Sequence, residues 1–314
     1  MAVPPSVEPP DLHTYGPAGR SAWLDVDWRE HRRFVRIGGR PLNVVELGGG
    51  PPLLFVHGLG GCWQNWLENL PHLARDHRVI ALDLPGFGAS GMPASDVSVA
   101  GYARVLEELC DALEVGCVSL VGNSMGGFIA AELAIASPAR VQRLVLVSAA
   151  GLHIAELRLD RALDRLGRAE RAFSRGGAFV AARSTTFARR ARLRRIVLAG
   201  VAAHPELLPW PLVAEQVAGA GRPGFMPALR AMAAYPLRHR LGQITCPTLI
   251  VWGARDRVVP VRDAATFAQL IPDARKVVYP DTGHVPMLER PARFNADVRG
   301  FVDGRWPVAG DRGT

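Results

Sequence analysis

The chain alternates between short apolar runs and segments with helical spacing, and this alternation limits the possible folds more than any other feature. PPLLFVHG (51–58) and RVIALDLPGFGAS (78–90) are apolar runs that end in glycine-rich turns, which is typical of strands buried on both faces. Strands alternating with helices predict an α/β fold with a mostly parallel, doubly wound sheet. Four further runs continue the pattern: CVSLVG (117–122), RLVLVSA (143–149), TLIVWG (248–253) and KVVYP (276–280).

Helical spacing occupies most of the gaps between these predicted strands. EHRRFVRI (30–37) and PLNVVEL (41–47) instead alternate polar and apolar residues on either side of Gly38-Gly39, which predicts a hairpin. Elsewhere apolar residues recur at intervals of three and four, the spacing of an amphipathic helix. The predicted helices span residues 64–75, 98–114, 126–136, 262–271 and 291–303.

A long segment, residues 152–243, interrupts the alternation and has no convincing strand pattern. Within it, LRLDRALDRLGRAERAF (157–173) places its apolar residues near one stripe, and AGVAAHPELLPWPLVAEQVAGAG (199–221) is apolar and broken by prolines. We interpret the segment as a helical cap, or lid, inserted between two core strands. The predicted organisation is therefore a disordered, proline-rich N-terminal tail (1–24), an α/β core (25–151 and 244–305) and the helical cap (152–243).

The positive charge of the chain is concentrated in the same segment. The formal net charge is +8, and Lys276 is the one lysine among 37 basic residues. Residues 152–243 contain 16 arginines and six acidic residues. We interpret these arginines as a solvated face, and weak association with a membrane surface or an anionic lipid is the alternative. No nucleic-acid-binding motif accompanies them, so we expect no nucleic-acid partner.

Several features favour a cytoplasmic protein without a cofactor. MAVPPSVEPPDLH (1–13) lacks the basic and apolar regions of a signal peptide, and the apolar runs are too short to cross a bilayer as helices. The glycine runs 48–50 and 58–61 complete neither a P-loop nor a dinucleotide-binding motif. The cysteines show no spacing of metal ligands, so we expect reduced, buried thiols and no metal. They are Cys62, Cys110, Cys117 and Cys246.

The stretch LVGNSMGG (120–127) lies between a predicted strand and a predicted helix. A Gly-x-Ser-x-Gly pattern in that position is typical of a sharp turn that exposes the serine hydroxyl. We expect Gly122 and Gly126 to make room for the strand–helix crossing, with Asn123 in support. The N-terminus of the following helix would then face any oxyanion formed at Ser124. The alternative is that glycine and serine simply end a strand.

A serine hydroxyl needs a base to become a nucleophile, and the base needs an acid to orient it. Asp256 follows the predicted strand TLIVWG, and His284 follows KVVYP. Ligands of open parallel sheets bind at the carboxyl ends of the strands, where both residues fall together with Ser124. The chain order Ser, Asp, His is the one expected of this fold. Asp281 is a competing acid, and Asp83 is interpreted as a turn residue.

The loop after the predicted strand 51–58 supplies a candidate oxyanion hole. It reads His57-Gly58-Leu59-Gly60-Gly61. The backbone N–H groups of Leu59 and Met125 would converge on a developing oxyanion, which such donors stabilise by about 3 kcal/mol each. We interpret His57 as a residue that shapes this loop, with Gly58 in support, and not as a base.

Together these motifs resemble the α/β-hydrolase superfamily over nearly the whole chain, from about residue 30 to 303. The resemblance implies that Ser124 is the nucleophile, that His284 is the general base and then the general acid, and that Asp256 orients it. It also implies that 152–243 is a cap domain. The matching pieces, in the expected order, are HGLGGCWQNW, DLPGFGAS, GNSMGG, WGARDRVVP and DTGHVPMLERP. Within the cap, surface or packing roles are expected for His153, His204 and His239.

The nucleophile decides among the reactions of this superfamily, because its haloalkane dehalogenases and epoxide hydrolases carry Asp where this chain has Ser124. We therefore predict a serine hydrolase that cleaves carboxylic esters of apolar small molecules through an acyl-enzyme intermediate. GNSMGG is also similar to hydrolases that cleave carbon–carbon bonds of ring-cleavage diketones, although Val285 stands where those enzymes usually have Trp. Enol-lactone hydrolysis and cofactor-free haloperoxidase or perhydrolase activity stay open. A ligand-binding protein on the same fold is the non-enzyme alternative.

Overall fold

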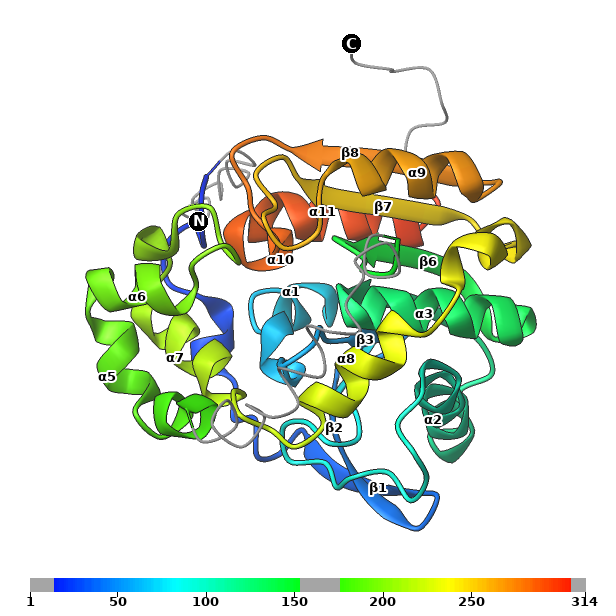
Figure 1. The fold of residues 1–314 in the computed structure, drawn as a ribbon, viewed down its shortest axis with the longest axis horizontal. Coiled ribbons are helices and arrows are strands. Elements are labelled where there is room, and N and C mark those ends of the chain that lie inside the picture. The colour runs from blue at the N-terminus through cyan, green and yellow to red at the C-terminus, as the bar shows by residue number, and fades with distance from the viewer. Residues whose placement is uncertain (1–13, 153–175, 306–314) are drawn as a thin grey trace, which may run out of the picture.

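A computed structural model describes residues 14–152 and 176–305 of the chain. One eight-stranded sheet with the order β1-β2-β4-β3-β5-β6-β7-β8 forms its centre, and in Figure 1 it runs from β1 at the bottom to β8 at the top. The predicted α/β sheet is thereby confirmed. Its strands are β1 (Arg32–Ile37), β2 (Arg40–Leu47), β3 (Pro52–Val56), β4 (Arg78–Leu82), β5 (Val118–Asn123), β6 (Val141–Val147), β7 (Thr248–Gly253) and β8 (Ala274–Tyr279).

The first two strands form the predicted hairpin. Ile37 pairs with Arg40, which leaves Gly38 and Gly39 as a two-residue turn. Their φ angles of 53° and 75° are both positive, and this is the conformation that gives a hairpin turn the twist of its strands. Strand β2 also pairs antiparallel with β4, whereas every other neighbouring pair is parallel. The sheet is therefore mostly parallel, as expected.

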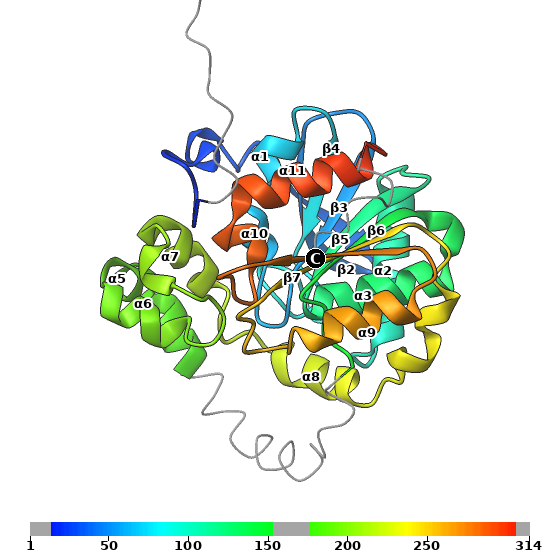
Figure 2. The same ribbon diagram turned by 90° about the horizontal axis from the view of Figure 1, so that it is seen from above.

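Two layers of helices cover the sheet because successive strand residues point to opposite faces. Leu54 and Ile250 belong to a core cluster shared with helices α2, α3 and α9. Their neighbours Leu53 and Leu249 belong to a second cluster shared with α1 and α11. Figure 2 shows the two sets of helices on opposite sides of the sheet. These helices are α1 (Leu70–Leu73), α2 (Val99–Ala112), α3 (Met125–Ala136), α9 (Arg262–Leu270) and α11 (Pro291–Val302).

The prediction of one continuous helix at residues 64–75 is wrong. Residues 64–75 fold into a 3₁₀ helix, η2 (Trp63–Trp66), followed by the single turn of α1. Pro71 lies in the first turn of α1, where its missing N–H is tolerated but would interrupt a longer helix. The proline therefore separates the two pieces. A further short helix that the pattern did not predict, α10 (Pro286–Glu289), follows the loop after β8.

The prediction of a disordered tail over 1–24 is wrong for the residues that the structure describes, which begin at residue 14. Ser21 and Trp23 are buried. The Ser21 hydroxyl and the Trp23 indole N–H both donate to Glu68 Oε1, at 2.6 and 2.8 Å. Proline-rich composition suggested disorder, but a tryptophan and a buried acceptor are enough to fix this segment on the core.

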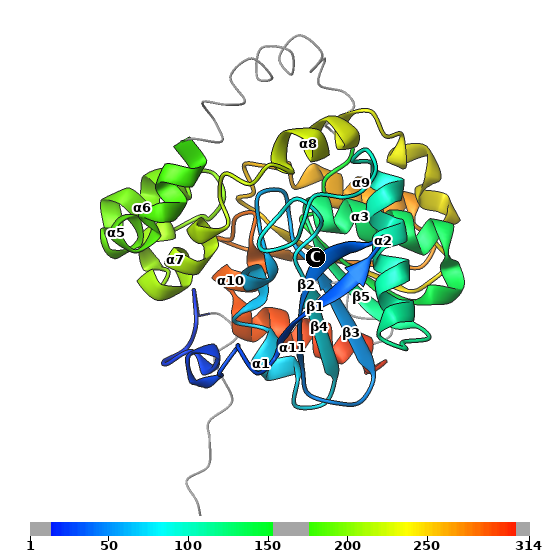
Figure 3. The ribbon, with the colours of Figure 1, turned by 90° about the horizontal axis from the view of Figure 1, so that it is seen from below.

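Helices and not strands fill the described part of the insertion between β6 and β7. Figure 3 shows α5, α6 and α7 gathered at one side of the molecule, whereas α8 lies beside the core. The predicted helix 157–173 lies outside the described residues. No described helix combines the length and the apolar composition that a membrane span requires. The helices of the insertion are α5 (Ser184–Arg189), α6 (Ala191–Val197), η4 (Pro205–Leu207), α7 (Trp210–Ala218), α8 (Phe225–Ala233) and η5 (Leu237–Gln243).

Candidate active site

Ser124 lies in the sharp turn between β5 and α3. Its backbone has φ 52° and ψ −115°, a region that non-glycine residues rarely adopt and that costs about 1–3 kcal/mol. A Cβ on Gly122 would lie 2.4 Å from the carbonyl oxygen of Gly126, and one on Gly126 would lie 2.1 Å from that of Val56. Both positions therefore require glycine, because the strand and the helix cross at backbone contact. The pattern marks a strained turn and not merely the end of a strand.

The first N–H groups of α3 and the loop after β3 lie beside this serine. Met125 is the first residue of the helix, so its N–H has no partner within the helix. A Cβ on Gly58 would lie 3.2 Å from Ser124 Cβ, which shows how closely the two loops approach. Leu59, the next residue, lines the same cavity as Ser124. The arrangement is compatible with an oxyanion hole between Leu59 and Met125.

His57 fixes the shape of the loop that carries Leu59. Its Nδ1–H donates to the carbonyl oxygen of Gly58 at 2.7 Å, and its Nε2 accepts the backbone N–H of Leu84 at 2.9 Å. The side chain is fully buried, and this burial lowers the pKa of His57 below its ordinary value. Both ring nitrogens of His57 are therefore engaged by the backbone around the loop, which is compatible with a residue that shapes the loop.

His284 and Asp256 form a buried pair at the carboxyl ends of β8 and β7. His284 Nδ1 lies 2.8 Å from Asp256 Oδ2, and the exposed fractions of the two side chains are 7% and 0%. The second carboxylate oxygen of Asp256 accepts the backbone N–H groups of Val258 and Val259, both at 2.9 Å. Because the carboxylate requires a donor at Nδ1, the neutral imidazole keeps Nε2 as a free acceptor. His284 and Ser124 line one cavity.

The two competing acids have other partners. Asp281 Oδ1 lies 2.9 Å from His204 Nε2 and 2.7 Å from an Arg255 nitrogen. Asp83 accepts the backbone N–H groups of Trp63 and Ala89, both at 2.8 Å, and the side-chain amide of Asn43, also at 2.8 Å. Asp256 is thus the aspartate that contacts His284, and Asp83 accepts donors from the turn that follows β4. His204 has a partner on the core, which agrees with a packing role.

Two contacts hold the histidine loop, one from the serine turn and one from the end of β7. The Asn123 side-chain amide donates to the carbonyl oxygens of Val147 and His284, at 3.1 and 3.3 Å. At the end of β7, a Cβ on Gly253 would lie 2.0 Å from the carbonyl oxygen of Gly283. One buried amide therefore holds the histidine loop against the serine turn, and backbone contact at a glycine holds it against β7.

A cavity of about 380 Å³ opens between these loops and the insertion. Its wall is mostly apolar, and none of its described lining residues is cationic. Asn65 and Gln216 are polar exceptions, and the Asn65 amide donates to Gln216 Oε1 at 2.5 Å across the boundary between core and insertion. The sequence reasoning missed both residues, since an amide on a helix carries no motif. The insertion contributes Leu198, Val201, Leu208, Gln216, Phe225, Leu229 and Met232 to the wall.

The side chains that could bind a metal do not cluster in the described part of the chain. Among residues 14–152 and 176–305, no three His, Cys, Asp or Glu side chains gather as they would around an ion. Cys62, Cys110 and Cys246 are buried, Cys117 is exposed, and all four thiols are free. Burial raises the pKa of Cys110 and of Cys246 to about 11, so these thiols stay protonated at neutral pH.

Comparisons with known proteins agree with this geometry. The model of the alpha/beta hydrolase fold family matches residues 51–291. The chain is 34% identical over 279 residues to the dihydrolipoyllysine-residue acetyltransferase component of the acetoin cleaving system of Pseudomonas putida, covering 85% of this chain and 68% of that protein. It is 32% identical over 288 residues to 2-hydroxymuconate semialdehyde hydrolase of Pseudomonas sp. (strain CF600), covering 86% and 93% of the two chains.

A solved structure of similar shape is that of a thermophilic esterase from Thermogutta terrifontis. The TM-score is 0.72 at 26% identity, and the match covers 87% of this chain and 98% of the esterase. The family match, the two relatives and this structural likeness extend over most of the chain, core and insertion included. The chain belongs to the alpha/beta hydrolase fold family and is a hydrolase.

Proposed function

We propose that this hydrolase cleaves carboxylic esters of apolar small molecules, with Ser124 as nucleophile, His284 as base and Asp256 as its orienting acid. The observation that carries the proposal is the buried Asp256–His284 contact of 2.8 Å beside the cavity that Ser124 also lines. That contact engages Nδ1 and leaves Nε2 to accept a proton. The strained backbone of Ser124 presents its hydroxyl to the same space.

In the proposed reaction, Ser124 Oγ attacks the ester carbonyl while His284 Nε2 takes the hydroxyl proton. The backbone N–H groups of Leu59 and Met125 stabilise the oxyanion, and the dipole of α3 acts in the same direction. The imidazolium, stabilised by Asp256, then protonates the departing alcohol. A water molecule, deprotonated by the same Nε2, hydrolyses the acyl-enzyme and restores Ser124.

The cavity favours a neutral, apolar substrate. Its described wall carries mainly side chains such as Leu208, Phe225 and Met232, which gain from contact with an apolar acyl or alcohol group. A carboxylate buried against such a wall without a cation would lose its hydration with little in return. We therefore favour a neutral ester over an anionic substrate.

Cleavage of a carbon–carbon bond in a ring-cleavage diketone is the second candidate. The 32% identity to 2-hydroxymuconate semialdehyde hydrolase supports it, because one fold can carry out several chemistries. The apolar cavity wall and Val285 after His284 favour the ester.

A panel of p-nitrophenyl esters from acetate to long acyl chains, with Ser124→Ala as the blank, tests the proposal directly. We expect hydrolysis by the wild type at least about 10³-fold above the variant. No hydrolysis of any ester, combined with bleaching of a coloured dienoate substrate, would favour the second candidate. A fluorophosphonate probe that labels the wild type but not His284→Ala would exclude a non-catalytic binding protein.

We also propose weak association of the insertion with anionic lipid, through a basic segment that we define as residues 179–210. No acidic residue occurs between Phe179 and Pro205. Large apolar side chains in this segment are exposed, with Ile196 at 70% and Leu207 at 60%. Arginine beside exposed apolar side chains is the composition of interfacial helices. The exposed arginines are Arg183, Arg189, Arg190, Arg192 and Arg195.

A further inference from the structure

Glu289, at the end of α10, is a fully buried carboxylate that no step of the proposed reaction uses. It accepts the backbone N–H of Gly283, which lies 2.9 Å from each of its oxygens. It also accepts the backbone N–H of Val285 at 3.3 Å. These two N–H groups flank His284 on either side. The carboxylate therefore holds the loop at the two points between which the imidazole is carried.

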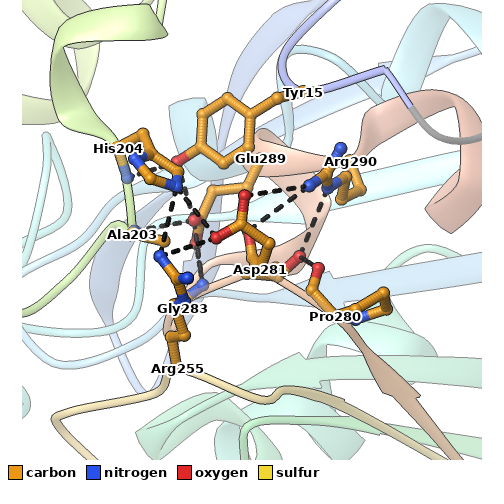
Figure 4. Close-up of polar contacts among 10 residues, drawn as sticks. Tyr15, Ala203, His204, Arg255, Pro280, Asp281, Gly283, Glu289 and Arg290 are labelled. Atoms are coloured by element: carbon orange, nitrogen blue, oxygen red, sulfur yellow. Dashed lines mark hydrogen bonds and ion pairs between the residues drawn. The ribbon is translucent and has the colours of Figure 1, made fainter.

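The same carboxylate holds two segments that are remote in the sequence. Glu289 Oε2 accepts the hydroxyl of Tyr15 at 2.7 Å and the backbone N–H of Ala203, in the insertion, at 2.8 Å. Figure 4 shows Tyr15, Ala203 and Gly283 arranged around Glu289. The Tyr15 hydroxyl in turn accepts the backbone N–H of His204 at 2.9 Å. The N-terminal segment, the insertion and the histidine loop thus meet at one carboxylate.

The insertion also contacts the histidine loop directly. The backbone N–H of His284 donates to the carbonyl oxygen of Val201 at 2.7 Å. A Cβ on Gly283 would lie 2.7 Å from that same oxygen and 2.8 Å from the backbone nitrogen of Ala203. The two backbones are in van der Waals contact, so a shift of the insertion at 201–203 must move the loop that carries His284.

Within the part of the chain that the structure describes, Glu289 accepts hydrogen bonds from neutral donors and forms no ion pair. Burial raises the pKa of Glu289 above its ordinary value, while the donors at Ala203, Gly283 and Tyr15 oppose that shift. The adjacent guanidinium of Arg290 is directed elsewhere, 5.1 Å over the Tyr15 ring and 3.7 Å from Asp281. Replacing the carboxylate by an amide would exchange one acceptor oxygen for a donor that faces other donors.

We propose that Glu289 is a positioning residue for His284, and that Tyr15 and the insertion backbone at Ala203 act on the imidazole through it. The placement of His284 in the cavity that Ser124 also lines then depends on the contacts of Tyr15 and of the insertion backbone at Ala203 with Glu289. This inference rests on the proposed function for the role of His284. The placement itself is a structural property that can be measured without any substrate.

Glu68 provides a matched control, because it is a second buried carboxylate that anchors the N-terminal segment. Its side chain accepts Ser21 Oγ and Trp23 Nε1, and the residue is 4% exposed. Burial raises its pKa, as it does for Glu289. Its contacts, however, do not include the loop at His284. A purely structural role would give Glu68→Gln and Glu289→Gln similar effects.

The experiment compares Glu289→Gln, Tyr15→Phe and Glu68→Gln in the full-length protein. The first readout is the ¹H resonance of the His284 Nδ1 proton, which lies far downfield because of its short bond to Asp256 and is assigned by its absence in His284→Ala. The second is kcat and KM for the best ester. We expect Glu289→Gln to shift or broaden the resonance and lower kcat about 10-fold or more, with KM changed less than about twofold. We expect Tyr15→Phe to move both readouts in the same direction by less, and Glu68→Gln to leave both near wild type.

The outcomes separate the inference from the proposed function. An unchanged resonance and kcat in Glu289→Gln, or equal changes in Glu68→Gln, would overturn the positioning role. If the wild type hydrolyses no ester but Glu289→Gln alone shifts the resonance, the positioning role stands and the proposed function fails. Should Glu289→Gln not fold, Tyr15→Phe decides, because it removes one hydroxyl and keeps the ring; a wild-type resonance and kcat in that variant would then overturn the inference.

Discussion

Two histidine–aspartate pairs lie at the same edge of the sheet, and their comparison shows that the length of a hydrogen bond does not distinguish the proposed catalytic pair from a pair at the surface. His284 and Asp256 are 2.8 Å apart, and His204 and Asp281 are 2.9 Å apart. The exposed fractions of the side chains are 7% and 0% in the first pair but 28% and 43% in the second. Burial and the cavity distinguish the pairs, and distance does not.

The other partners of each carboxylate show the same contrast. Two backbone N–H groups, at Val258 and Val259, fix Asp256 from behind. Asp281 instead contacts side chains: besides His204, it lies 2.7 Å from Arg255 and 3.7 Å from Arg290. Backbone donors have little freedom to move, whereas long arginine side chains exchange partners with water. Asp256 is therefore a fixed acceptor, and Asp281 is a surface one.

The largest expected effect is a difference in kcat between two variants, each of which replaces the aspartate of one pair by asparagine. Asp256→Asn should lower kcat for the best ester by about 10³–10⁴-fold, because the amide no longer favours the tautomer with a proton on Nδ1. Asp281→Asn should stay within about threefold of wild type, and Asn tolerates the positive φ of 50° at this position. Steady-state kinetics on both variants checks the contrast. Similar losses in the two would mean that the wrong acid has been assigned.

A smaller effect is expected from disturbing the backbone contact behind the buried pair. Gly253→Ala would place a Cβ 2.0 Å from the carbonyl oxygen of Gly283, so the loop with His284 must move, and a displacement of about 1 Å can cost about 10²-fold in rate. Gly116→Ala is the matched control, since its Cβ would meet nothing within 4 Å. The measurements are kcat and the melting temperature. Wild-type kcat in Gly253→Ala would show that the contact is not needed.

The exposed pair of His204 and Asp281 should stabilise the folded state, but only at pH values at which the Asp281 carboxylate is charged. The hydrogen bond from His204, with Arg255 and Arg290 nearby, lowers the pKa of Asp281 below its ordinary 3.8. The folded state therefore gains from the charged carboxylate above that unfolded value and loses the gain as the pH falls through the lower folded pKa. Asp281→Asn should lower the melting temperature by about 2 °C or less near pH 6 and by less still near pH 3. A difference that grows toward acid pH would contradict this sign.

The smallest expected effect concerns the exposed arginines of the basic segment. The protein should cosediment with phosphatidylglycerol vesicles at low salt and not with phosphatidylcholine vesicles, and the attraction should fade at 0.5 M salt because charges are then screened within a few ångströms. The variant used in this test keeps Arg194, because the Arg194 guanidinium donates to the backbone carbonyl oxygens of Ala188 and Glu206. If the protein bound both lipids equally, or if the substituted variant bound phosphatidylglycerol vesicles as well as the wild type does, the arginines would be interpreted as a solvated face only. The substituted variant carries serine at Arg189, Arg190, Arg192 and Arg195.

The core of the fold could be predicted because its signals are local and repeated. Continuous apolar runs become strands buried on both faces, as in β5 and β7, where every residue is buried. The motifs at Ser124, Asp256 and His284 each follow such a strand, so their common edge follows from the topology alone. The helix at 64–75 was predicted less well, because Pro71 overrides the apolar spacing.

Glu289, Tyr15, Asn65 and Gln216 could not have been found in this way. Each is an ordinary polar residue whose partner lies far along the chain, as with Tyr15 and Glu289, which are 274 residues apart. Such contacts depend on how loops from different elements pack, and the spacing of apolar residues in the sequence does not predict them. The assignment of residues 1–24 to a tail failed for the same reason at Trp23.

The amino-acid sequence alone determined the sheet, the strained serine turn and the order of the three residues placed at one edge. These features depend on hydrophobic periodicity and on glycine at backbone contacts, which are local properties of the chain. Tertiary structure alone decided which partners hold Asp256 and Asp281 and which buried carboxylate holds the loop of His284. Those choices depend on burial and donor geometry, and both arise only when distant segments pack together.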